Sequence, residues 1–336
     1  MIRKKVVLTG MWVDDERVEK LKQYILDEYP QADIKWLTQL PLPEEKIIEE
    51  CREAEVLVAG HQEMTDKAYK ELNLKAYCAL STGFNAANPD AATCNGILVT
   101  NVPDYCVDEV SVHTLMLMLA CVRGINKLIP YVKGGNWGIE PIKPITRFEG
   151  CTIGLLGFGR IPRKVAKKLS GFDVNIIAND PYVKQDEADQ YRVEMVSFEE
   201  LVEKSDILSI HAPLLPTTKY IINEEVFKRM KPTSYIINTS RGPLIDQEAL
   251  YLALSEGWIR GAGLDVLENE PPKEEDRKII DLPNVIVSGH SGFYSEEALE
   301  DQLKLVSQEV GRVLRGEMPK NVVNKEVLNK IDWIKK

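Results

Sequence analysis

Short apolar runs alternate with longer segments of helical periodicity along nearly the whole chain, and this alternation constrains the fold more than any other feature. Val6-Val7-Leu8 and Val56-Leu57-Val58-Ala59 are apolar at every position, whereas residues 13–29 between them carry apolar side chains at helical spacing. Strands that are apolar on both faces are typical of a parallel sheet that helices cover on both sides. The sequence therefore predicts an α/β protein built from doubly wound parallel sheets.

The alternation becomes sharper in the second half of the chain. Six strands are predicted there, at residues 152–156, 174–178, 206–210, 235–238, 262–266 and 285–288, with helices between most of them. This rhythm is typical of a doubly wound nucleotide-binding domain. A long helix is predicted before these strands, at residues 105–123, and a last helical stretch follows them at residues 295–314. No further strand follows for this last helix to accompany, so we expect it to return to the first domain and make that domain discontinuous.

Charge and cysteine content exclude several classes of protein. The chain carries 52 acidic and 42 basic side chains, a formal net charge of −10, and no basic cluster. We therefore expect neither nucleic acid nor a membrane as a partner. Six cysteines without a C-x-x-C pair, and a start without the pattern of a secretory signal, indicate reduced thiols in a cytoplasmic protein. No His, Cys and Asp cluster has metal-ligand spacing, so no metal is expected.

A glycine-rich turn follows the first of the six strands. Gly157-Phe158-Gly159-Arg160-Ile161-Pro162 opens a predicted helix and matches the dinucleotide-binding pattern G-x-G-x-x-G, except that Pro162 replaces the third glycine. The first glycine permits a tight turn, the second lets the backbone approach a pyrophosphate, and the helix N-terminus provides N–H groups. Asp180 lies 21 residues after Gly159, where the pattern expects an acid that binds the adenosine ribose and repels a 2′-phosphate. NAD is therefore favoured over NADP, while a purely structural turn stays open as the alternative.

Polar and ionisable side chains follow four of the other predicted strands. His211, the segment Thr239-Ser240-Arg241-Gly242, Asp265 and His290 each stand at a carboxyl end. The carboxyl ends of a doubly wound sheet form the crevice where ligands bind, so we expect these residues to face one cleft. Two of the four histidines of the chain are among them. A third, His113, lies within the predicted long helix and is interpreted as a packing or interface residue.

The order and spacing of these segments give the chain a resemblance to a known family. The matching segments are the Gly157 turn, His211-Ala212-Pro213-Leu214 with Thr218, Asn238-Thr239-Ser240-Arg241-Gly242, Gly263-Leu264-Asp265-Val266, Glu268-Asn269-Glu270-Pro271 and Ser288-Gly289-His290. Over nearly its whole length the sequence resembles the D-isomer-specific 2-hydroxyacid dehydrogenases. Residues 290–295 and 319–324 are similar to the branch that contains the C-terminal-binding-protein corepressors.

The resemblance implies a domain organisation and an assembly. A Rossmann NAD-binding domain at residues 104–293 would be inserted into a flavodoxin-like substrate domain at residues 1–103 and 294–336. The family also implies a homodimer built on the nucleotide domain. The predicted long helix and the loop after it, which includes Trp137, would form the interface.

The resemblance further assigns roles to individual residues. It implies a catalytic set of Arg241, Glu270 and His290. Cofactor contacts are implied for Gly157, Phe158, Gly159, Arg160, Ile161, Asp180, His211, Ala212, Pro213, Thr218, Thr239, Ser240, Arg241, Asp265, His290 and Gly292. Substrate contacts are implied for Thr82, Gly83, Phe84, Tyr105, Arg241, His290 and Phe293.

The side chains of the implied catalytic set suit hydride transfer between NAD and a 2-keto acid. Arg241 offers a planar cation that can bind a carboxylate through two parallel hydrogen bonds. His290 can give a proton to the carbonyl oxygen as the alkoxide forms. Glu270 beside the imidazole would favour the charged ring and fix its orientation. Asp265 would accept a hydrogen bond from the nicotinamide carboxamide.

One segment narrows the range of possible substrates. It is Leu80-Ser81-Thr82-Gly83-Phe84-Asn85, which resembles the family loop whose backbone N–H groups face the substrate carboxylate. This segment contains no lysine or arginine, so a substrate phosphate would find no partner in it. We therefore expect a small or medium 2-keto acid, from glyoxylate, hydroxypyruvate or pyruvate-like acids to bulkier ones. Two alternatives stay open, namely an NAD(H)-sensing binding protein of the corepressor type and a phosphite-type oxidation on the same fold.

Overall fold

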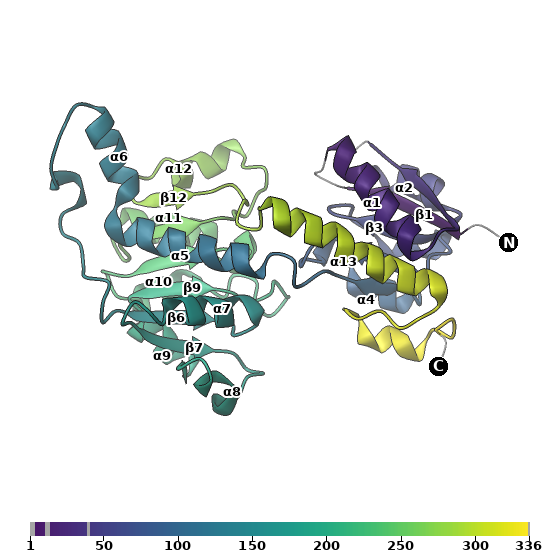
Figure 1. The fold of residues 1–336 in the computed structure, drawn as a ribbon. Coiled ribbons are helices and arrows are strands. Elements are labelled where there is room, and N and C mark those ends of the chain that lie inside the picture. Colours follow the sequence, from purple (N-terminus) through teal and green to yellow (C-terminus); the bar gives the residue numbers. More distant parts are fainter. Residues whose placement is uncertain (1–3, 11–13, 39–40, 335–336) are drawn as a thin grey trace. The chain divides into compact units, whose positions relative to one another are not determined.

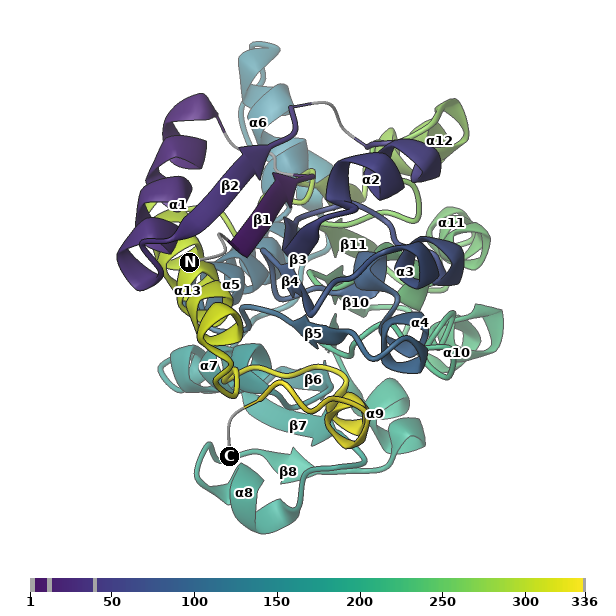
Figure 2. The same ribbon diagram turned by 90° about the vertical axis from the view of Figure 1, so that its right-hand side faces the viewer.

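The chain forms two compact units, each with its own sheet. The structure is a computed structural model that describes residues 4–10, 14–38 and 41–334. One unit comprises Met1–Cys106 and Ser295–Lys336, and the other comprises Val107–Tyr294. The boundaries expected after residues 103 and 293 lie within three residues of these divisions. Parallel strands lie between helices in both units, so the predicted α/β class with two doubly wound sheets is confirmed (Figures 1 and 2).

The first unit is built on a five-stranded parallel sheet in the order β2-β1-β3-β4-β5, which is the flavodoxin-like order. Its strands are β1 (Lys4–Thr9), β2 (Ala32–Trp36), β3 (Ala54–Ala59), β4 (Ala76–Ala79) and β5 (Leu98–Thr100). Val6 of the central β1 lies opposite Ile34 on one side and Val56 on the other. Val6 and Val56 are fully buried because helices cover both faces of the sheet.

Five helices surround this sheet. They are α1 (Asp15–Glu28), α2 (Glu44–Cys51), α3 (Asp66–Glu71), α4 (Pro89–Cys94) and α13 (Glu296–Arg315). Figure 2 shows α1 and α13 on one face and α2, α3 and α4 on the other. Helix α13 begins after Ser295, whose hydroxyl accepts the N–H of Ala298, and ends at Gly316 in the left-handed region. Arg17 of α1 pairs with Glu296 at 2.7 Å, so the last long helix is part of the first unit.

The second unit holds a seven-stranded parallel sheet in the order β12-β11-β10-β9-β6-β7-β8. Its strands are β6 (Thr152–Leu156), β7 (Asn175–Asn179), β8 (Glu194–Met195), β9 (Ile207–Ile210), β10 (Tyr235–Asn238), β11 (Gly261–Leu264) and β12 (Val285–Val287). Six of them were predicted. The seventh, β8, has only two residues and no apolar run that would indicate a strand. The sheet reverses direction of winding between β6 and β9, and their carboxyl ends therefore border the crevice of a doubly wound fold.

Helices cover both faces of the second sheet as well. They are α5 (Val107–Arg123), α6 (Ile125–Lys133), α7 (Arg160–Leu169), α8 (Gln185–Asp189), α9 (Phe198–Lys204), α10 (Glu224–Arg229), α11 (Gln247–Ser255) and α12 (Arg277–Ile280). Helix α5 packs on α7 and on strands β10 and β11, and its buried face includes Val110, Thr114 and Leu117. Among the described residues no single helix meets the length and hydropathy that a membrane span needs, and only α5 and α6 taken together do, with a 62° bend between them.

Candidate active site

The glycine-rich turn joins β6 to α7 at the crevice. Gly157 has φ +92°, and a Cβ placed on it would lie 2.9 Å from the carbonyl carbon of His211 and 3.0 Å from the nitrogen of Ala212. Only glycine fits there, because both the backbone angle and the neighbouring chain exclude a side chain. Gly159 precedes α7, and a Cβ on it would meet nothing within 4 Å. Because Gly159 has no side chain, a diphosphate could approach the N–H groups at the N-terminus of α7.

Pro162 does not disturb this arrangement. It lies in the first turn of α7, where its missing N–H would have no partner within the helix, and it is buried. Phe158 contributes only its backbone to the turn, because its ring is fully buried against Tyr191.

Asp180 follows β7 and is held directly beside the glycine turn. Its Oδ2 accepts the N–H of Phe158 at 2.8 Å, and its Oδ1 accepts the N–H of Tyr182 at 2.9 Å. Each carboxylate oxygen can accept more than one hydrogen bond, so the group can still receive ribose hydroxyls.

The segment after β9 is fixed by hydrogen bonds within the second unit. The hydroxyl of Ser240 donates to the carbonyl oxygen of Ala212 at 2.7 Å. The hydroxyl of Thr218 donates to the carbonyl oxygen of Pro213 at 2.7 Å. His211 has its Nε2 2.9 Å from the Oγ of Ser209. Burial lowers the pKa of His211 to about 3, so this ring is neutral at physiological pH. His211 therefore supports the loop and is unsuited to supply a proton.

Arg241 follows β10 on a short turn that a buried asparagine holds. The Nδ2 of Asn238 donates to the carbonyl oxygen of Arg241 at 2.9 Å, and its Oδ1 accepts the N–H of Ser240 at 3.0 Å. The guanidinium donates through Nη1 to the carbonyl oxygen of Ser240 at 2.6 Å. Thr239 is anchored through its Oγ1, which lies 2.9 Å from that of Thr114 on α5. The turn thus carries a cation on backbone that is rigidly held.

Glu270 and His290 form a close pair of ionisable side chains at this edge. Oε2 of Glu270 lies 2.6 Å from Nδ1 of His290, and both side chains are about one-third exposed. Oε1 of Glu270 accepts the N–H of Leu267 at 3.2 Å, which fixes the carboxylate. His290 itself has φ +55° and donates its N–H to the carbonyl oxygen of Asp265 at 2.5 Å. Since Nδ1 is engaged by the carboxylate, Nε2 is the ring atom that can exchange a proton with a ligand.

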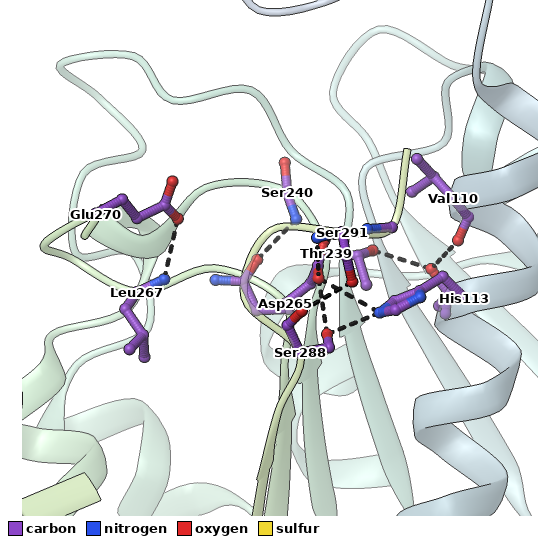
Figure 3. A network of polar contacts seen from close by, with 12 residues as sticks. Val110, His113, Thr239, Ser240, Asp265, Leu267, Glu270, Ser288 and Ser291 are labelled. Atoms are coloured by element: carbon purple, nitrogen blue, oxygen red, sulfur yellow. Dashed lines mark hydrogen bonds and ion pairs between the residues drawn. The ribbon is translucent and has the colours of Figure 1, made fainter. Parts of the chain in front are cut away.

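Asp265 stands at the centre of the hydrogen-bond network that Figure 3 shows. Its Oδ1 accepts the hydroxyl of Ser288 at 2.7 Å and the N–H of Ser291 at 2.9 Å, and its Oδ2 accepts the N–H of Gly292 at 3.0 Å. Nε2 of His113 lies 3.3 Å from Oδ1. Burial by itself would raise the pKa of Asp265, but its four donors outweigh burial and lower the pKa to about 2. The sequence predicted a cofactor contact here and missed this anchoring of residues 288–292.

His113, Ser288 and Ser291 belong to this network, and sequence reasoning placed none of them at the site. His113 was interpreted as a packing or interface residue. A signal was available, because His113 is three residues after the buried Val110 and four before the buried Leu117 of α5. That spacing puts His113 on the face of the helix that meets the sheet.

The predicted substrate contacts are divided between the two units. Thr82, Gly83, Phe84 and Tyr105 belong to the first unit, and Phe293 belongs to the second. The loop that carries Thr82 is tied down, since Asn101 donates to the carbonyl oxygen of Thr82 at 2.8 Å. Tyr105 is buried at 7% exposure. The ring of Phe293 meets that of His290 edge to face, with their centroids 6.2 Å apart.

The fold and this edge together define a dinucleotide-binding protein of the Rossmann class with an ionisable pair beside the cofactor crevice. Within the described ranges, no group of three or more His, Cys, Asp or Glu side chains could hold a metal ion. Residues 115–292 match the family described as D-isomer specific 2-hydroxyacid dehydrogenase, NAD binding domain. The chain belongs to the D-isomer specific 2-hydroxyacid dehydrogenase family, an enzyme family that uses NAD.

Individual relatives agree with this assignment. The chain is 36% identical over 330 residues to a glyoxylate reductase from Thermococcus litoralis. This match covers 92% of this chain and 98% of the relative. It is 40% identical over 286 residues to a D-3-phosphoglycerate dehydrogenase from Methanocaldococcus jannaschii, but this match covers 84% of the chain and only 54% of that relative. A solved glyoxylate reductase from Paecilomyes thermophila superposes with a TM-score of 0.84 at 26% identity, over 97% of this chain and 100% of that one. These matches leave the similarity to the corepressor branch a prediction.

Proposed function

We propose that this protein reduces a small or medium 2-keto acid to the D-2-hydroxy acid with NADH, and catalyses the reverse oxidation with NAD. The observation that carries the proposal is the 2.6 Å contact between Glu270 and Nδ1 of His290 at the carboxyl edge of the Rossmann sheet. A histidine held in this way keeps one orientation and presents Nε2 outward. That atom can give a proton to a carbonyl oxygen and take it back in the reverse direction.

The neighbouring side chains support separate parts of this reaction. When bound, the reduced nicotinamide would supply the hydride that reduces the carbonyl carbon. The proton that completes the hydroxyl leaves Nε2 of His290, and Glu270 stabilises the imidazolium from which it leaves. Arg241 provides the cation for the substrate carboxylate, on a turn that Asn238 holds. Asp180 favours NAD over NADP, because a 2′-phosphate near its carboxylate would be repelled.

The substrate class rests on the absence of a phosphate partner in the loop at residues 80–85, which contains no lysine or arginine. We therefore propose glyoxylate, hydroxypyruvate or pyruvate-like acids, or bulkier uncharged homologues, in preference to phosphorylated ones. The names of the glyoxylate reductases among the relatives support this choice. The phosphoglycerate relative does not outweigh it, because only about half of that relative is matched.

The experiment is a screen of 2-keto acids in which NADH and NADPH oxidation are followed by absorbance, with the reverse reaction run on D- and L-hydroxy acids. We expect turnover of at least one unphosphorylated 2-keto acid with NADH, and of its D-hydroxy acid with NAD. Tight NADH binding without any turnover would instead support the NAD(H)-sensing protein. NAD reduction by phosphite alone would support the phosphite-type oxidation.

We also propose a homodimer formed through α5, α6 and the loop that follows them. Large apolar side chains are exposed along this part of the second unit, namely Val112, Met116, Ile125, Ile129, Val132, Trp137 and Ile139. Many exposed apolar side chains on neighbouring segments of the chain favour a protein–protein interface. Light scattering coupled to size-exclusion chromatography should give the mass of two chains, and Trp137→Ser together with Ile129→Ser should shift it toward one.

A further inference from the structure

His113 links helix α5 to the loop that carries His290. Its Nε2 lies 2.7 Å from the Oγ of Ser288 and 3.3 Å from Oδ1 of Asp265, and its side chain is only 16% exposed (Figure 3). His113 comes from the first helix of the second unit, whereas Ser288 follows its last strand. The contact therefore joins the two ends of this unit at the edge where the proposed catalytic pair lies.

The direction of these hydrogen bonds follows from the charge of Asp265. An ionised carboxylate can only accept, so the hydroxyl of Ser288 donates its proton to Oδ1 at 2.7 Å. The Ser288 oxygen must then accept from His113, which places a proton on Nε2 of His113. The arrangement differs from a nucleophilic triad, because the serine hydroxyl donates its hydrogen bond to the aspartate and the imidazole acts as a donor to the serine. His113 thus serves as a fixed donor and does not activate Ser288.

Packing around Gly292 shows that the imidazole also shapes the loop. A Cβ on Gly292 would lie 2.8 Å from Oδ2 of Asp265 and 3.3 Å from Cγ and Cδ2 of His113. The backbone at Gly292 is therefore enclosed between the carboxylate and the ring. Both ends of the loop depend on Asp265, since its carbonyl oxygen accepts the N–H of His290 and its carboxylate accepts those of Ser291 and Gly292.

We propose that His113 is a positioning residue for the proposed reaction. Its Nε2–H holds the Ser288 hydroxyl and the Asp265 carboxylate in the one arrangement that fixes residues 288–292, and through that loop it sets His290 against Glu270. The inference rests on the proposed function, because a misplaced imidazole matters to turnover only if His290 exchanges the proton. It requires no contact between His113 and the substrate or cofactor.

The test compares two substitutions that differ in the donor. Glutamine can place its Nε2 near that of histidine, whereas leucine has a similar size and no donor. Loss of the His113 donor should loosen the loop that carries His290 and lower kcat for the 2-keto acid by about tenfold or more in His113→Leu, with KM changed by less than about threefold. His113→Gln should recover kcat to within about threefold of wild type. Thermal unfolding of both variants reports any general loss of stability.

Hydrogen exchange of the amides at residues 288–294 provides a readout that does not depend on activity. Exchange in the absence of substrate should be faster in His113→Leu than in wild type, and close to wild type in His113→Gln. Wild-type kcat and exchange in His113→Leu would overturn the proposal, as would equal impairment of the two variants. If the wild-type protein turns over no 2-keto acid, the proposed function fails. The exchange comparison then still supports or overturns the role of His113 in fixing the loop.

Discussion

Replacing Asp265 with asparagine keeps the size of the side chain and removes its charge. The carboxylate accepts three hydrogen bonds shared between its two oxygens, Nε2 of His113 lies 3.3 Å from Oδ1, and the side chain is 3% exposed. An amide can offer only one oxygen to these donors. Its NH₂ group must therefore face either the N–H of Gly292 or the donors on the other side, which leaves buried N–H groups without an acceptor.

The expected loss in the free energy of unfolding of Asp265→Asn follows from the pKa of Asp265, which is lowered from 3.8 to about 2 in the folded chain. A carboxyl whose pKa is depressed by folding stabilises the protein above its unfolded pKa, and this contribution disappears as the pH falls through the folded pKa. A difference of this size corresponds to about 2 kcal/mol at pH 7 and about 1 kcal/mol at pH 3. The free energy of unfolding of Asp265→Asn should therefore lie about 2 kcal/mol below wild type at pH 7, with the gap narrowing in acid.

Urea unfolding followed by circular dichroism at pH 7, 5 and 3 measures this difference. Asp281→Asn serves as the control, because it makes the same chemical change at an exposed acid in the same unit. The control should match wild type within about 0.5 kcal/mol at each pH. A deficit of Asp265→Asn that is the same at pH 3 as at pH 7, or that is no larger than the control's, would refute the reasoning.

Four further substitutions test other parts of the site. Gly157→Ala should lower the free energy of unfolding, measured by urea denaturation, by about 1–3 kcal/mol. The reason is that φ is +92° at this position and the added Cβ would lie too close to the backbone of His211. Gly159→Ala should leave stability within about 1 kcal/mol but raise the Kd for NADH in a fluorescence titration, since the added methyl group occupies the open side of the turn. Folding lowers the pKa of His211 from 6.5 to about 3, so below pH 6.5 the unfolded chain binds a proton that the folded chain does not. The free energy of unfolding of wild type should therefore fall by about 2 kcal/mol between pH 7 and pH 5 through this group. His211→Gln should not show this part of the fall. Asp180→Ser should lower the ratio of kcat/KM for NADH to that for NADPH by about tenfold, and an unchanged ratio would remove Asp180 from cofactor choice.

The parts of the site that local patterns describe were predictable from the sequence. The turn at Gly157 and the acid at Asp180 are separated by a spacing that one βαβ unit sets, so their meeting at Phe158 needs no knowledge of the rest of the fold. Residues at the carboxyl ends of successive strands were likewise expected at one edge. Strands β4, β5 and β8 were not predicted. Strand β8 has only two residues and no apolar run, and two of the four residues of β4 are alanine, which is uncommon in strands.

Contacts between segments that are distant in the chain could not be predicted from the sequence. His113 and Ser288 are 175 positions apart, and nothing in either local pattern indicates the other. The helical spacing of His113 puts it on the buried face of α5, but a buried histidine on a helix has many possible partners. The family resemblance implied that Asp265 contacts the cofactor, and its place at the end of a strand indicated only that it faces the crevice. That place alone could not indicate that its carboxylate also anchors the backbone of Ser291 and Gly292.

The central claim is that His290, held by Glu270, exchanges the proton during hydride transfer. The most direct measurement compares kcat and the Kd for NADH in wild type and His290→Gln, with a 2-keto acid that the screen identifies. Loss of a general acid should lower kcat by about 10²- to 10⁴-fold, while the Kd for NADH stays within about threefold. A His290→Gln variant that retains the wild-type kcat would contradict the account, whatever its effect on NADH binding.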